Sequence, residues 1–323
     1  MKGSLSDSTK RVMDIKNRKW LIAGGVVGLF LLASKLLQAV ELTLPRVPLA
    51  DGVDVAIEWA TINLAPFFDG IKLVVIKLLV AITAFFDWVP WIVWVVAVGG
   101  AAFRWLGIRT AVFFLAGLLT IVSVGLWDHA MSTIALVSTS MVLILVTGIP
   151  IGIMASRNDR FESALRPVLD AMQTMPSFVY LIPVIFLLGS GKVPAVLATM
   201  IYATPPAIRL TNLALRQVSP EIKEAARSFG ATPFQMLFKV ELPLAVATIM
   251  AGVNQSLMMA ISMVVIASLI GAGGLGNDVL FAMSRVRVGD GFEAGLAILV
   301  LAIVVDRSTQ ALGQRASKET RTE

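Results

Sequence analysis

The stretch "EAARSFGATPFQMLFKVELP" (residues 224–243) places charged and turn-forming residues between two long apolar runs. Just before it, Ser219 is a good N-cap, Pro220 suits the first helical position, and Glu221 favours the positive end of a helix dipole. Gly230 can adopt the left-handed conformation that ends many helices. These signals predict a short helix from Pro220 that ends at Gly230.

A second helix is predicted directly after Gly230. Thr232 is followed by Pro233 at the first helical position, and Gln235 stands three residues after Thr232, which completes a capping box. Pro243 is expected to limit this helix. The stretch 219–243 is therefore predicted to form a rigid elbow of two capped helices.

The elbow combines small side chains with larger ones. Ala225 and Ala226 would let the backbone of a partner approach closely, and bulkier or charged groups surround them, namely Glu224, Phe229, Phe234, Leu237 and Phe238. Exposed aromatic groups of this kind suit a docking surface. The alternative is an interfacial hairpin that only anchors the protein to the bilayer.

The composition is that of an integral membrane protein. The chain is 57% hydrophobic and 15% charged, its mean hydropathy is +0.84, and its net charge of +6 falls in short clusters between apolar runs. Many Gly and Pro residues in apolar segments favour packed helices over a barrel. We therefore predict an all-α polytopic fold whose basic clusters hold loops in the cytoplasm. The absence of cysteine excludes disulfides and thiolate chemistry.

About eight spans are predicted from the lengths of the apolar runs, at 20–40, 89–103, 110–127, 130–155, 174–190, 193–209, 246–270 and 292–306. An even number returns the carboxyl terminus to the side of the amino terminus, and basic residues near both ends place that side in the cytoplasm. The predicted organisation is a cytoplasmic segment 1–19, a signal-anchor span 20–40, an outer segment 41–88, a helical hairpin 89–127, a core 128–307 and a cytoplasmic tail 308–323. Within the outer segment, 71–86 is expected to lie on the membrane surface as a helix, although a further span is the alternative.

Two glycine-rich stretches are not nucleotide sites. "GSGKVP" (189–194) lacks both the first Gly and the Ser or Thr of a phosphate-binding loop. "GAGGLG" (271–276) ends an apolar run and follows no strand, so it is expected to break the helix 246–270 rather than to bind a dinucleotide. Any ATP hydrolysis coupled to this chain must belong to another polypeptide.

Neutral residues are the candidates for a transport path. Phe178, Tyr180, Asn254, Met258 and Ser262 could line or gate one, with aromatic faces suited to a quaternary ammonium group. Ordinary helix packing is the alternative for each of them. Apart from Glu293 at the start of the last span, the core spans carry no carboxylate before Asp306, which disfavours the rival class, an ion-coupled secondary transporter or channel.

The elbow resembles the EAA loop of binding-protein-dependent ABC importer permeases. The matching residues are Glu224-Ala225-Ala226, then Gly230, then Val240-Glu241-Leu242-Pro243, with Val240 in place of the family's Ile. "QTMPSFVYLIP" (173–183) and "NQSLMMAISMVVIASLIGAGGLG" (254–276) are similar to the glycine betaine and proline type of this family.

The resemblance implies a type I ABC importer (MetI-like) transmembrane domain with a five-helix core near 130–306. The elbow would be the coupling helix that seats in a separate ATPase subunit, with contacts from Glu224, Ala225, Ala226, Arg227 and Gly230. The chain would be no enzyme and hold no cofactor itself, since the partner ATPase binds ATP and Mg. Other implied partners are a periplasmic or tethered substrate-binding protein and a second permease subunit, as in a homodimer. The expected cargo is glycine betaine, proline betaine, choline or trimethylamine N-oxide, imported across the bacterial inner membrane.

Overall fold

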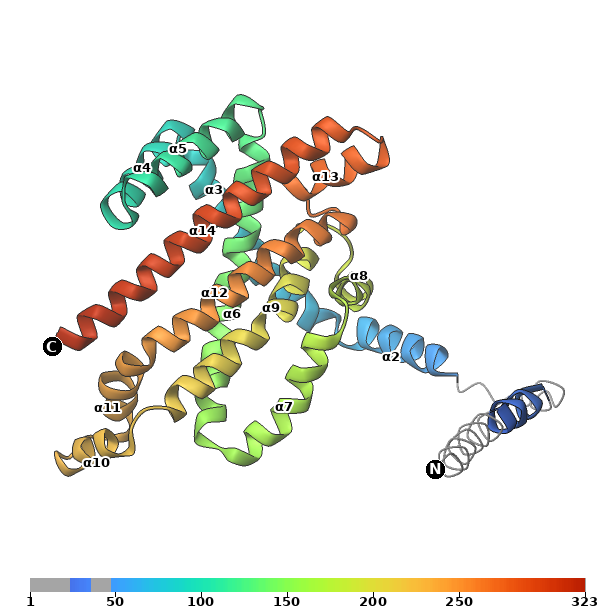
Figure 1. The fold of residues 1–323 in the computed structure, drawn as a ribbon, viewed down its shortest axis with the longest axis horizontal. Coiled ribbons are helices and arrows are strands. Elements are labelled where there is room, and N and C mark those ends of the chain that lie inside the picture. Colours follow the sequence, from blue (N-terminus) through green and yellow to red (C-terminus); the bar gives the residue numbers. More distant parts are fainter. Residues whose placement is uncertain (1–23, 36–47, 323) are drawn as a thin grey trace, which may run out of the picture. The chain divides into compact units, whose positions relative to one another are not determined.

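A computed structural model describes residues 24–35 and 48–322 (Figure 1). The chain divides into two units after Val55. In the first unit, Gly24–Lys35 forms an apolar helix whose side chains are mostly exposed. This helix lies inside the predicted span 20–40. The remainder of that span and the predicted cytoplasmic segment 1–19 lie outside the described residues.

The second unit, Ala56–Glu323, is helical throughout its described secondary structure. Its elements are the end of α2 (Leu49–Asn63), α3 (Ala65–Trp88), α4 (Trp91–Leu106), α5 (Ile108–Ser123), α6 (Trp127–Arg157), α7 (Asp159–Thr174), η1 (Ser177–Tyr180), α8 (Leu181–Leu188), α9 (Lys192–Arg216), α10 (Pro220–Ser228), α11 (Pro233–Gln235), η2 (Met236–Glu241), α12 (Leu242–Ile266), η3 (Ala267–Ile270), α13 (Leu275–Ser284) and α14 (Val288–Thr322).

Three long helices, α6, α9 and α12, pack against one another and form the centre of this unit (Figure 1). Glycines set their close approach. A Cβ on Gly152 of α6 would lie 2.8 Å from the carbonyl oxygen of Ile208, and one on Gly252 of α12 would lie 3.0 Å from that of Pro206, both on α9. Larger side chains at these two positions would push the helices apart.

Four of the predicted spans coincide with helices long and apolar enough to cross a membrane. These helices are Trp127–Arg157, Lys192–Arg216, Pro233–Ile270 and Val288–Arg315. Two bent helix pairs within the described residues raise the number to as many as six if each pair counts as one span. The total of eight predicted spans is therefore not tested.

The helical part of the predicted span 174–190 begins at Ser177 and comprises η1 and α8. α7 ends at Thr174, and the chain turns by 112° before η1 and α8. The break follows from Pro176, because a proline drives the preceding residue out of the helical region. Met175 accordingly has the extended dihedral angles φ −69° and ψ 137°.

The predicted hairpin 89–127 is present as α4 and α5, each 16 residues long. Its second helix ends earlier than the predicted 110–127, because Gly125 takes a left-handed φ of 75° after Ser123. Phe114 and Ile121 are buried in a second hydrophobic cluster that includes Leu301 of α14. The hairpin therefore packs against α14 (Figure 1).

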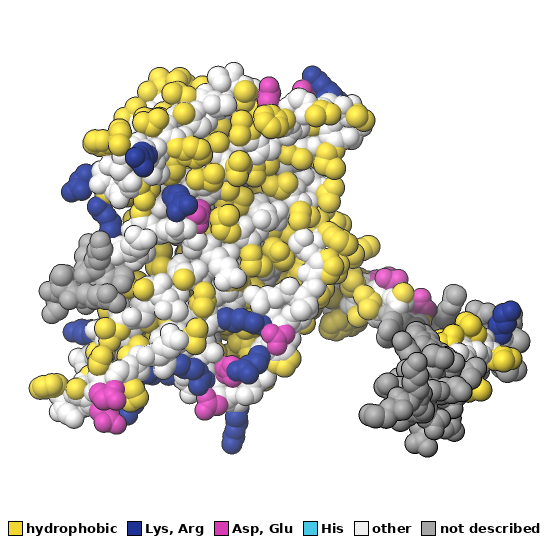
Figure 2. Space-filling view, in the orientation of Figure 1, with side chains coloured by type: hydrophobic (Ala, Val, Ile, Leu, Met, Phe, Trp, Pro, Cys, Tyr) yellow, Lys and Arg dark blue, Asp and Glu magenta, His cyan; other side chains and the backbone are white. Residues whose placement is uncertain are grey.

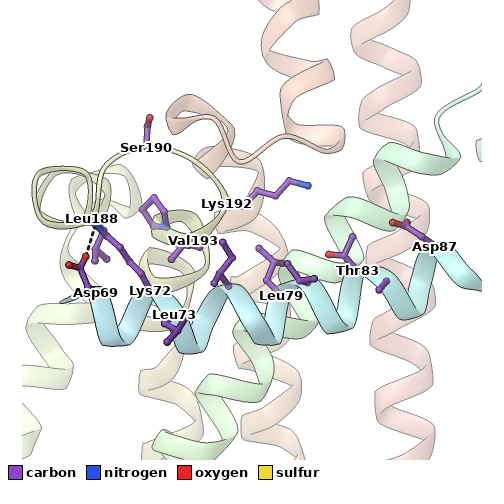
Figure 3. A pocket seen from close by; sticks show the side chains of 14 residues that line it. Asp69, Lys72, Leu73, Leu79, Thr83, Asp87, Leu188, Ser190, Lys192 and Val193 are labelled. Carbon is purple, nitrogen blue, oxygen red and sulfur yellow. Dashed lines mark ion pairs between the residues drawn. The ribbon is translucent and has the colours of Figure 1, made fainter. Parts of the chain in front are cut away.

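α3 is longer than the surface helix predicted over 71–86, and it packs on the centre of the unit. Val75 and Leu79 are buried in the same cluster as residues of α6 and α9. Beside them, α3 and the start of α9 border an apolar groove of about 810 Å³ (Figure 3). The position of α3 relative to a membrane stays a prediction.

The two ends of the central helices carry different structures. "GAGGLG" ends the helix as predicted, with Gly271 in the left-handed region at φ 84°, and α13 follows. α10 and α11 lie at the opposite end of α12 (Figure 1). Basic and acidic side chains gather at this end, over α7 and α10, whereas apolar side chains cover much of the remaining face (Figure 2). The elbow therefore belongs to the more charged end of the unit.

Candidate functional site

The predicted elbow is present, and Gly230 forms its corner. α10 ends at Ser228, and Gly230 has a φ of 80°, a region that side chains with a Cβ rarely adopt. The N–H of Gly230 donates to the carbonyl of Arg227 over 2.9 Å, and that of Ala231 donates to Ala226 over 3.1 Å. A Cβ on Gly230 would meet no atom within 4 Å. Glycine is therefore needed here for backbone conformation and not for space.

The capping box of the second helix is confirmed. The Thr232 hydroxyl accepts a hydrogen bond from the Gln235 N–H over 3.3 Å, and the Gln235 carbonyl oxygen Oε1 accepts one from the Thr232 N–H over 2.9 Å. The capping role of Ser219 is only partly right. Ser219 occupies the N-cap position, but its hydroxyl donates to the Glu221 carboxylate, which lowers the pKa of Glu221 below its ordinary value.

The prediction that Pro243 limits the second helix is wrong. The chain is helical from Pro233 to Ile270, and Pro243 lies in the first turn of α12. The preceding turn, η2, is a π-helix. A π-helix closes its hydrogen bonds over five residues instead of four, so the wider turn accommodates a proline that lacks an N–H. The elbow thus continues directly into a central helix.

The outward side of the elbow combines charge with aromatic surface. We call Glu224, Ala225, Arg227, Phe229 and Phe234 the elbow surface; all five residues are exposed, and Ala226 beside them is half-buried. Phe229 is 92% exposed and Phe234 is 70% exposed. In the described part of the chain, neither Glu224 nor Arg227 forms an ion pair. Such an exposed apolar and charged surface is typical of a docking site.

The candidate path residues do not form a single cluster. Tyr180 is buried, its hydroxyl donates to the Met172 carbonyl, and its ring packs on Tyr202 with centroids 5.7 Å apart. The Asn254 side-chain amide donates to Asp306 over 2.8 Å, which joins α12 to α14. These two residues therefore take part in helix contacts.

Three other path candidates face away from the packed core. Met258 and Ser262 lie one turn apart on an exposed side of α12, where the Ser262 hydroxyl donates to the Met258 carbonyl over 3.1 Å. Phe178 is 56% exposed on η1, an element that also contacts α12. The structure thus leaves these side chains open to a partner or solute.

Sequence reasoning missed a buried ion cluster behind the elbow. Glu241 is 1% exposed and contacts Arg157 and Lys223. Glu241 lies between Val240 and Leu242 of the EAA-like match. The available signal was a carboxylate placed directly before an apolar run, since a charge in that position needs a partner.

Comparison with known proteins agrees with this arrangement. Residues 148–318 match the family described as "Binding-protein-dependent transport system inner membrane component". The chain is 46% identical over 268 residues to the glycine betaine transport system permease protein OpuAB of Bacillus subtilis (strain 168), covering 83% of this chain and 95% of that protein. It is likewise 46% identical over 268 residues to the glycine betaine/proline betaine transport system permease protein ProW of Escherichia coli (strain K12), covering 83% and 76%.

A solved structure shares the fold. A chain from an inward-facing structure of the MetNI methionine ABC transporter aligns with a TM-score of 0.51 and 23% identity, over 60% of this chain and 95% of that one. This likeness supports the MetI-like helical architecture predicted from the sequence. With the matched family covering the elbow, α9, α12 and the end of α6, the chain belongs to the binding-protein-dependent transport system inner membrane components and is the permease subunit of an ABC importer.

Proposed function

We propose that this permease imports a small methylated amine and that glycine betaine or proline betaine is its cargo. The names of the two relatives above support this choice within the four cargoes expected from the sequence. The exposed, mostly uncharged faces around Phe178 and Met258 support it chemically, because aromatic and polarizable groups attract a quaternary ammonium without binding it tightly.

The single observation that carries the transport mechanism is the continuity of the elbow with α12. We assign ATPase docking to the elbow surface and to Ala226 and Gly230. Because the chain is helical from Pro233 to Ile270, a displacement of the docked elbow would move the start of a central helix directly. ATP and Mg would be bound by the ATPase subunits, and this chain would carry out no covalent chemistry.

We further propose that two copies of the chain form the translocation path, fed by a substrate-binding protein on the outer side. The core 128–307 would supply that path, with Phe178, Tyr180, Asn254, Met258 and Ser262 along or behind it. The exposed side of α12 that carries Met258 and Ser262 supports this assignment. Asn254 would support the path indirectly, through its hydrogen bond to Asp306.

Transport is tested with proteoliposomes that contain the chain, its ATPase and its binding protein. Internal ATP is expected to raise uptake of radiolabelled glycine betaine or proline betaine at least tenfold over ATP-free vesicles. Choline and trimethylamine N-oxide serve as competitors and as alternative labelled cargoes. Uptake of any of these solutes at the same rate without ATP would contradict the importer and favour an ion-coupled carrier.

Membrane orientation is tested by labelling. We propose that the elbow and both termini face the cytoplasm, as the basic clusters support. Because the chain has no cysteine, single-cysteine variants give clean readouts. Gly70→Cys and Gly289→Cys are expected to react with an impermeant maleimide in intact cells. Ser228→Cys on α10 is expected to react only after permeabilisation, and the reverse pattern would overturn this orientation.

A further inference from the structure

A carboxylate is buried where the elbow joins the central helices. Glu241 is the last residue of η2, immediately before α12, and its side chain is 1% exposed. Glutamate is rarely this buried unless an opposite charge compensates the loss of hydration. The residues that contact Glu241 therefore show which helices it joins.

The first partner comes from the end of α6. Arg157 is the last residue of that helix, and its Nη1 donates to Glu241 Oε1 over 3.1 Å while its Nη2 donates to Oε2. Two parallel hydrogen bonds of this kind fix orientation as well as distance. The pair joins residues 84 positions apart, so it attaches the start of α12 to the end of α6.

The second partner comes from the elbow itself. Lys223 lies in α10, next to Glu224 of the elbow surface, and its Nζ is 3.5 Å from Glu241 Oε1. The same ammonium donates to the carbonyl of Leu215 over 3.0 Å. Leu215 lies in the last turn of α9, where carbonyls lack partners within the helix. Lys223 thus connects α10 both to Glu241 and to α9.

A separate set of contacts joins α9 to α6 and to α7 without Glu241. Arg216 Nη2 donates to the Ala155 carbonyl over 2.8 Å, and Arg216 Nη1 donates to Asp159 over 2.7 Å. Loss of the Glu241 charge therefore leaves α6 and α9 tied at this end. What it removes is the ionic attachment of α6 and of α10 to the start of α12.

We propose that Glu241 is a positioning residue that transmits the movement of α10 to α6 and α12 through Lys223 and Arg157. This inference rests on the proposed function, because it takes the elbow as the ATPase contact. Without the buried carboxylate, α10 could move with the ATPase while α6 and the start of α12 lag behind. ATP hydrolysis would then continue with less transport.

The test compares uptake with ATP hydrolysis in the same proteoliposomes. Glu241→Gln keeps the size of the side chain and removes its charge, and it is expected to lower the uptake per ATP hydrolysed at least tenfold in the assembled complex. Lys223→Met is expected to lower this ratio about threefold, and Lys223→Arg to restore it. Asp159→Asn, which removes an exposed carboxylate outside the cluster, is expected to leave the ratio unchanged.

An unchanged ratio in assembled Glu241→Gln complexes would overturn the proposal. If that variant fails to assemble, Lys223→Met decides, because it leaves the Arg157–Glu241 pair in place; an unchanged ratio there overturns the proposal equally. Failure of the proposed function can be told apart from failure of this inference, because the unaltered complex itself would then show no ATP-dependent uptake.

A readout independent of transport uses spin labels at Ser228→Cys on α10 and Met154→Cys on α6. Lys223→Met and Glu241→Gln are expected to broaden the distance distribution between the two labels, whereas Asp159→Asn leaves it unchanged. An unchanged distribution in both cluster variants would show that the buried carboxylate does not hold the elbow.

Discussion

Gly230→Pro is expected to abolish ATP-dependent uptake while the protein still reaches the membrane. Gly230 has a φ of 80°, whereas proline fixes φ near −65°. Proline also removes the N–H that donates to the Arg227 carbonyl over 2.9 Å. The corner between α10 and α11 would therefore open, and the elbow surface would lose its shape. Co-purification of the ATPase with the tagged permease measures this loss, alongside uptake.

Gly230→Asn is the matched control for this change. Asparagine tolerates the left-handed conformation better than other residues with a Cβ, and a Cβ here meets no atom within 4 Å. Gly230→Val, which fits the space but not the backbone conformation, is expected to fall between Asn and Pro, since the left-handed conformation costs such residues about 1–2 kcal/mol. Full ATPase retention by Gly230→Pro would contradict the docking role of the elbow.

Phe229→Ser is expected to weaken ATPase association by about 10- to 150-fold. The ring is 92% exposed in the isolated chain, so the change removes no internal packing. If the ATPase covers the ring, the loss equals the burial of one aromatic side chain, about 1.5–3 kcal/mol, and about 1.4 kcal/mol corresponds to tenfold in affinity. Titration of the purified ATPase onto the permease in nanodiscs measures the shift.

Phe292→Ser provides the control for that experiment. Phe292 is 71% exposed near the start of α14, at the end of the unit opposite the elbow. Its replacement removes the same apolar surface but is expected to leave ATPase affinity unchanged. Equal affinities for Phe229→Ser and the unaltered chain would show that the ATPase does not cover Phe229.

Local features of the elbow could be predicted from the sequence because they depend on residues a few positions apart. The capping box needs only Thr232 and Gln235 at a spacing of three residues, and the helix corner needs only a glycine at Gly230. The long apolar runs likewise predicted the helices that contain 130–155, 193–209, 246–270 and 292–306, since length and hydropathy are properties of one segment.

The sequence predicted less well where a helix bends and which segments contact one another. The run 174–190 has the hydropathy of a span, yet α7 ends at its first residue and the chain turns by 112° at Met175 and Pro176 before the helix Ser177–Leu188 begins. Pro243 has the opposite outcome, because a π turn lets the helix continue through it. The effect of a proline on a helix thus depended on the conformation of the backbone before it as well as on the residue itself.

The sequence by itself determined the class of the protein, the elbow and its match to an importer family. Only the tertiary structure decided which polar groups meet, such as Asn254 with Asp306 and Glu241 with Arg157 and Lys223. The physical reason is distance. The sequence shows that a charged side chain beside an apolar run needs a partner, but it does not show which residue is that partner. An ion pair forms only when the two groups lie within about 4 Å. Only the packing of α6, α9 and α12 brings groups that are far apart in the sequence, such as Arg157 and Glu241, within that range.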